Sequence, residues 1–88
     1  MAEVRAGVDA IDRQLVELLR VRFGYMDAAA RIKPERGMVR DEGRKAQVIT
    51  QARAHAAQLG VPEAVVADLW ERLVEASIAH ELAAFDRR

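Results

Sequence analysis

The sequence contains no cysteine and only two prolines, Pro34 and Pro62. Without cysteine the chain has neither a disulfide framework nor a thiolate that binds a metal or attacks a substrate. A cytoplasmic protein does not need these groups. No apolar run approaches the roughly 18 residues that a membrane span requires, and the N-terminus lacks the apolar segment of a secretion signal. These absences predict a cytoplasmic protein with no membrane partner.

A charge excess of one sign is also absent. Fourteen Lys and Arg residues balance fourteen Asp and Glu residues, so the formal net charge is zero. A protein that coats nucleic acid needs a basic surplus, so we expect no nucleic-acid partner, and any bound anion should be small and locally held. His55 and His80 have no further ligand at metal-binding spacing. We therefore expect neither a metal ion nor a cofactor.

Three long segments contain no helix breaker, because the prolines and three of the glycines fall in two short stretches. The sequence predicts an all-α fold of three helices in a single domain, residues 1–88. The predicted helices cover residues 3–33, 41–59 and 62–85, with a loop at 34–40. Asp41 is the expected N-cap or first-turn acid of the second helix, and Gly60 its C-terminal cap. We expect residues 86–88 to be a solvated, frayed end.

The first helix is long for a chain of 88 residues. At ~1.5 Å per residue it spans roughly 46 Å. Twice the expected radius of gyration of a compact domain of this size is only ~24 Å. A short chain also buries only a modest share of its surface. Because the remaining residues cannot cover such a helix, we expect a second copy of the chain to cover it in a homodimer.

An arginine interrupts the apolar stripe of the first helix. Apolar residues recur with spacings of three and four, at Val8, Ile11, Leu15, Leu18, Tyr25, Ala29 and Ile32. Position 22 belongs to the same series, and it is Arg22. A buried guanidinium costs several kcal/mol unless it is paired. A salt bridge or an arginine head that reaches water would explain it, and so would a bound anion.

Further polar residues lie on inward-facing helix stripes, as Arg22 does. Lys33 follows Arg22 by eleven positions, and eleven steps of about 100° return to within about 20° of the same direction, ~16 Å along the axis. Ser77 and Glu81 form a one-turn pair on the inner face of the third helix. Polar positions on two core faces predict a shared polar pocket. Arg5 lies ~25 Å from Arg22, too far for one chain, but an antiparallel dimer brings it to the partner's site.

A set of spacings links these residues to a known family. They are Arg5-x-x-Val8-x-x-Ile11-Asp12-x-x-Leu15-x-x-Leu18-Leu19-x-x-Arg22, then Lys33, then Val39-Arg40-Asp41-x-x-Arg44, and finally Ser77. With them the chain resembles the all-helical (AroQ-type) chorismate mutases over essentially its whole length. The resemblance implies an intertwined homodimer of three-helix chains with two active sites.

The resemblance also implies which residues hold the substrate, a small dicarboxylate. Arginines at the positions of Arg22 and Arg44, with Arg5 from the other chain, bind its two carboxylates, and Ser77 contacts a carboxylate. Chorismate rearranges to prephenate without proton transfer or nucleophilic attack. The catalyst must therefore hold the reactive conformer and stabilise negative charge that grows on the ether oxygen. Arginine forks suit carboxylates, whereas a lysine suits a single oxygen.

At the ether oxygen the resemblance implies a donor role for Lys33, while Asp41 serves the substrate hydroxyl. Glu81 stands where the family often has glutamine, a second donor to the ether oxygen. An ionised carboxylate would repel that oxygen, so Glu81 has to be protonated to donate. This predicts an activity profile shifted to acid pH and faster turnover at pH 8 in Glu81→Gln.

Two alternative functions remain open on the sequence. Lys45 stands where the family usually has a glutamate that contacts the substrate hydroxyl, and residues 30–33 (ARIK) are similar to the related isochorismate-pyruvate lyases, which form salicylate and pyruvate. Asp41 favours the mutase, because these lyases tend to lack that acid. From a different class, a regulatory or structural helical dimer also has 3,4 spacing. It would pair Arg22 and Lys33 with acids rather than with a ligand.

Overall fold

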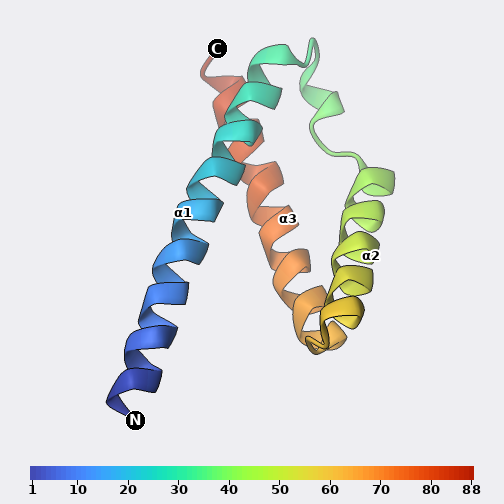
Figure 1. The fold of residues 1–88 in the computed structure, drawn as a ribbon. Coiled ribbons are helices and arrows are strands. Elements are labelled where there is room, and N and C mark those ends of the chain that lie inside the picture. Colours follow the sequence, from blue (N-terminus) through green and yellow to red (C-terminus); the bar gives the residue numbers. More distant parts are fainter.

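The structure, a computed structural model, describes all 88 residues and is entirely helical apart from short connections (Figure 1). Its elements are α1 (Ala2–Ile32), the short 3-10 helix η1 (Arg36–Met38), α2 (Glu42–Leu59) and α3 (Glu63–Asp86). The predicted all-α, three-helix fold is confirmed, with helix ends displaced by no more than one residue. The turn η1 lies inside the segment predicted as a loop. No helix combines the length and the apolar character needed to cross a lipid bilayer.

Local sequence explains where the helices begin and end. α1 stops before Lys33, whose backbone is extended (φ −64°, ψ 130°) because Pro34 follows it. Asp41 caps α2, since its side chain accepts a hydrogen bond of 2.9 Å from the backbone N–H of Arg44. Gly60 ends α2 in the left-handed conformation at φ 71°, which costs a glycine little.

α3 is the central element of the fold. It packs against the C-terminal half of α1 on one side and along α2 on the other, while α1 and α2 do not meet (Figure 1). Three buried residues, Val39, Val74 and Ile78, form the core, and Val48, Ile49, Trp70 and Leu82 pack around them. The core therefore lies on the inner side of α3, facing the loop and α2.

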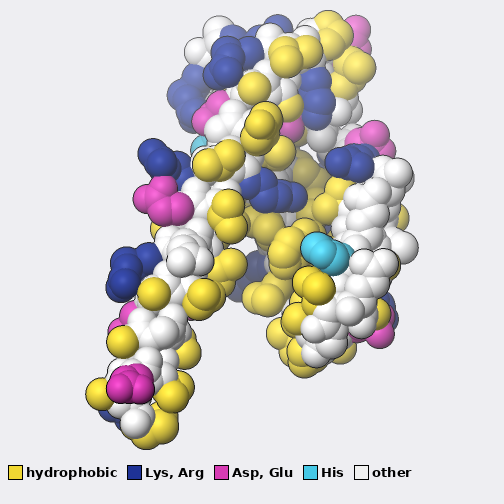
Figure 2. All heavy atoms as spheres, in the orientation of Figure 1, with side chains coloured by type: hydrophobic (Ala, Val, Ile, Leu, Met, Phe, Trp, Pro, Cys, Tyr) yellow, Lys and Arg dark blue, Asp and Glu magenta, His cyan; other side chains and the backbone are white.

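The N-terminal half of α1 extends away from this core (Figure 1). Its apolar side chains are more than half exposed at Val4, Val8, Ile11, Leu15 and Leu18. The radius of gyration is 15.5 Å, against ~12 Å for a compact domain of this length. Figure 2 shows hydrophobic side chains on this arm and on the opposite α2–α3 arm, with open space between them. The predicted long helix is confirmed, and its cover by a second chain stays a prediction.

The inward face of α1 differs from the predicted stripe beyond Arg22. Tyr25 and Ile32 are 69% and 79% exposed. Met26 and Lys33, each one position later, line the interior instead. A helix has 3.6 residues per turn, so a step of three and a step of four are equally compatible with a stripe. The packing of α3 selects between them.

Residues 86–88 are exposed, as predicted, but the prediction that they are frayed is wrong. Asp86 forms an ion pair with Arg36 at 2.8 Å. Arg88 donates hydrogen bonds to the backbone carbonyls of Ala30 and Lys33. Asp86, the last residue of α3, is therefore tied to η1, and Arg88 just beyond it to the end of α1.

Candidate active site

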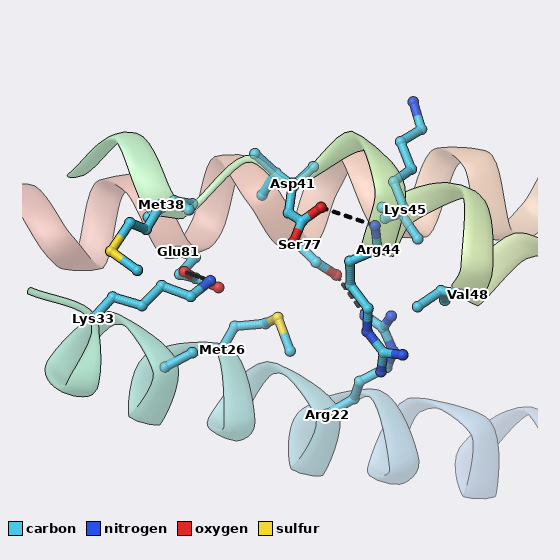
Figure 3. A pocket seen from close by; sticks show the side chains of 14 residues that line it. Arg22, Met26, Lys33, Met38, Asp41, Arg44, Lys45, Val48, Ser77 and Glu81 are labelled. Carbon is cyan, nitrogen blue, oxygen red and sulfur yellow. Dashed lines mark hydrogen bonds and ion pairs between the residues drawn. The ribbon is translucent and has the colours of Figure 1, made fainter. Parts of the chain in front are cut away.

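A cavity of about 440 Å³ lies between α1, α3, the start of α2 and the segment that precedes it (Figure 3). This volume lies within the ~300–1,000 Å³ typical of small-molecule sites. Seven of its 14 lining residues are hydrophobic. The polar and charged ones are Arg22, Lys33, Asp41, Arg44, Lys45, Ser77 and Glu81. The structure thus brings together six of the seven residues predicted for the site and adds Lys45.

Two arginines converge at one end of the cavity. Arg22 on α1 donates a hydrogen bond to the hydroxyl of Ser77 on α3, which in turn donates to the carbonyl of Leu73 at 2.7 Å. Ser77 is buried, so it holds the Arg22 head in a defined place. Arg44 reaches in from α2, and Figure 3 shows its guanidinium beside that of Arg22. Its own partner is the side-chain oxygen of Gln47, at 2.8 Å.

Neither Arg22 nor Arg44 forms an ion pair with a carboxylate. Burial lowers the pKa of Arg22, and the positive charge of Arg44 lowers it further. Both effects penalise a charged guanidinium, so this end of the cavity lacks a negative charge. A bound carboxylate would supply it and match the donor geometry of the arginine fork. The helical-dimer hypothesis predicted acidic partners for both Arg22 and Lys33, and within one chain Arg22 has none.

A lysine and a glutamate meet at the other end of the cavity. The Lys33 amino group lies 2.7 Å from a carboxylate oxygen of Glu81, whose side chain is only 6% exposed. In this respect Lys33 has the acidic partner that Arg22 lacks. Because an ion pair carries no net charge, the uncompensated charge of the cavity lies at the arginine end. The two ends are therefore chemically distinct.

Asp41 and Lys45 lie where α2 begins. Asp41 lines the cavity while one of its carboxylate oxygens caps the helix. The amino group of Lys45 points away from the other lining groups (Figure 3) and binds Glu71 at 2.7 Å and Glu75 at 3.0 Å. The sequence marked Lys45 as a departure from the family pattern but did not reveal these partners. Glu71 and Glu75 are one turn apart on α3, which was the available signal.

Sequence reasoning missed two further features. Met26, Met38 and Val48 supply much of the apolar lining. The only sequence signal for this lining was the position of Met26, four residues after Arg22. Outside the cavity, His80 on α3 lies 2.7 Å from a carboxylate oxygen of Asp27 on α1. No group of three or more His, Asp or Glu side chains is arranged to hold a metal ion.

Arg5 does not line the cavity. It lies near the start of α1, on the arm that extends away from α3 (Figure 1). Within one chain it is remote from Arg22, as the helix length predicted.

Fold and site together define a three-helix protein whose cavity suits a small anion with more than one acidic group. A model of the chorismate mutase type II family matches residues 4–82, and the chain belongs to this family. It is a chorismate mutase, an isomerase that converts chorismate into prephenate. No curated protein and no solved structure matches the chain. The family and the activity predicted from the sequence are confirmed, and the lyase alternative is not favoured.

Proposed function

We propose that the cavity is the mutase active site and that its arginine end binds the substrate carboxylates. Arg22 and Arg44 present adjacent guanidiniums without an acidic partner, and this single observation carries the proposal. The hydroxyl of Ser77 orients Arg22, and it binds a substrate carboxylate by turning its proton from the Leu73 carbonyl to the ligand. A dianion bound there would offset the mutual repulsion of the two arginines.

Lys33 and Glu81 act at the ether oxygen in this proposal, and Asp41 binds the substrate hydroxyl. The rearrangement breaks a carbon–oxygen bond as a carbon–carbon bond forms, and negative charge grows on the ether oxygen. The Lys33 ammonium stabilises that charge best in the transition state. Glu81 holds the ammonium at 2.7 Å and, when protonated, offers a second donor to the same oxygen.

A second copy of the chain completes each site. The N-terminal arm of α1 carries a row of exposed apolar residues, which two chains would bury against each other. An antiparallel arrangement would bring the partner's Arg5 to the arginine end of the cavity, where it would bind a substrate carboxylate. In this proposal residues 1–88 form one domain of an intertwined homodimer in the cytoplasm.

The test is an assay of the purified protein with chorismate and with isochorismate, in which prephenate and salicylate are measured. We expect prephenate only. Arg22→Met should keep its helical circular dichroism and lose about 10²- to 10³-fold in kcat/KM, since a fixed charged donor is removed. Arg20→Met is the matched control, because Arg20 is exposed on the same helix and pairs only with Glu17. Salicylate as the product, or a tenth or more of the activity in Arg22→Met, would contradict the proposal.

A further inference from the structure

The end of α3 holds the short segment that carries Lys33. Asp86 binds the Arg36 guanidinium through both carboxylate oxygens, at 2.8 and 3.1 Å. Arg88 donates to the carbonyl of Ala30 at 3.0 Å and to the carbonyl of Lys33 itself. The carbonyls of Ala30 and Lys33 are therefore bound by Arg88, just beyond α3, and the side chain of Arg36 by the last residue of α3.

Pro34 explains why such contacts are needed. In a continuing helix the N–H of residue 34 would donate to the carbonyl of Ala30, but proline has no N–H. The terminal carbonyls of α1 also carry its partial negative charge. Arg88 supplies a cationic donor at this point, and its guanidinium carbon lies 4.0 Å above the ring centre of Phe85, which helps to orient it. The side chain of Arg88, two residues beyond the end of α3, thus replaces the missing donor of Pro34.

We propose that Arg88 is a positioning residue for Lys33, and that Asp86 assists it by holding Arg36. Arg88 does not line the cavity, so it acts only through the backbone that it binds. Lys33 must place its amino group between Glu81 and the substrate, and the extended backbone at Lys33 sets where its side chain begins. A displacement of about 1 Å in such a group can cost ~10²-fold in rate. The inference rests on the proposed role of Lys33 at the ether oxygen.

The kinetic signature of this role is specific. Lys33 acts on charge that grows in the transition state, whereas the arginines bind the carboxylates before and during the reaction. Arg88→Ala should therefore lower kcat by about 5- to 20-fold and change KM by less than about twofold. Arg88→Lys should recover part of the loss, because an ammonium also donates to carbonyls. Arg87→Ala is the control, since Arg87 is an exposed neighbour whose side chain forms no hydrogen bond.

A double-mutant comparison separates positioning from general destabilisation. In a Lys33→Ala background the group to be positioned is gone, so Arg88→Ala should cause no further loss of kcat. An equal loss in both backgrounds, a change confined to KM, or wild-type kinetics in Arg88→Ala would overturn the proposal. If Lys33→Ala itself keeps full kcat, the proposed role of Lys33 fails instead.

Amide exchange gives a readout that does not depend on turnover. The Lys33 N–H donates to the carbonyl of Ala29 in the last turn of α1. We expect it to exchange faster with solvent in Arg88→Ala than in wild type or Arg87→Ala, because the end of α1 loosens. An unchanged exchange rate would show that Arg88 does not hold this backbone, and would also overturn the proposal.

Discussion

The two halves of α1 share one apolar spacing but have different surroundings. The C-terminal half packs against α3, and there its inward positions include Arg22 and Lys33. The N-terminal half extends free, with Val8, Ile11 and Leu15 each just over half exposed (Figures 1 and 2). The charged residues of the stripe thus lie where the chain covers itself. The part of the stripe that contains only apolar residues lies where the chain does not cover itself.

In the proposed homodimer, this difference separates association from catalysis along a single helix. An exposed apolar row gains free energy only when another surface removes it from water. A half-buried cation gains it only when an anion or a hydrogen-bond acceptor is present. Substitutions in the free half should therefore act first on association, and substitutions in the covered half on the reaction.

The largest effect is expected from breaking the free half. Ile11→Glu combined with Leu15→Glu places two carboxylates on the apolar row, and burying them unpaired costs several kcal/mol. We expect a monomer by light scattering, a lower Tm and a loss of more than about 10²-fold in prephenate formation. Arg13→Glu with Arg20→Glu, on the opposite side of α1, should remain dimeric. A fully active monomer would sink the idea that the free half completes the site.

The next experiment joins the two halves in one assay. Arg5→Ala and Arg22→Met should each be nearly inactive when prepared alone. In mixed dimers one site has both substitutions and the other has neither, so random re-association of equal amounts should restore about a quarter of wild-type activity. The measurement is prephenate formation after co-expression or joint refolding. A mixture no better than its components would place Arg5 outside the partner's site.

A smaller effect is expected at the lysine end of the cavity. In Glu81→Gln the amide donates a hydrogen bond at any pH and no longer pairs with Lys33 as an ion, so turnover at pH 8 should rise several-fold over wild type. Glu71→Gln, on the outer side of α3, is the matched control. If Glu81→Gln is slower than wild type at every pH, Glu81 is not a donor.

The smallest effect concerns stability in acid. Hydrogen bonds from Arg40 and then Lys45 lower the pKa of Glu75 from 4.5 to about 2. A depressed folded-state pKa stabilises the fold above pH 4.5, and this contribution is lost as the pH falls toward about 2. Glu75→Gln should therefore lower the Tm slightly at pH 7 and leave it unchanged near pH 2. The loss of Tm at pH 7 should be smaller in high salt, because Glu75 is exposed to screening. This prediction is tested by thermal melts of Glu75→Gln, with Glu35→Gln as the control. Equal losses of Tm at pH 7 and near pH 2 would contradict it.

The fold was largely predictable because its boundaries are local. Pro34, Asp41 and Gly60 act on the backbone within a few residues, and the structure places the helix ends where these residues predict them. The alignment of Arg22 with Lys33 was predictable as well, since helix geometry alone sets it. Tyr25 was assigned to the interior instead of Met26, because only the position of α3 distinguishes neighbouring steps on a helix.

The sequence by itself determined three helices, their ends and a row of cations on one face, which follow from hydrogen bonding and periodicity within one segment. It also determined an uncovered arm, because the first helix is too long for the rest of the chain to cover. Tertiary structure alone decided which of those cations have partners. α3 brings Glu81 to Lys33 but no acid to Arg22, and it brings Arg88 to the carbonyl that Pro34 leaves without a donor. The reason is physical: hydrogen bonds and charge pairs depend on distances of a few ångströms between residues about 50 positions apart, which only packing sets.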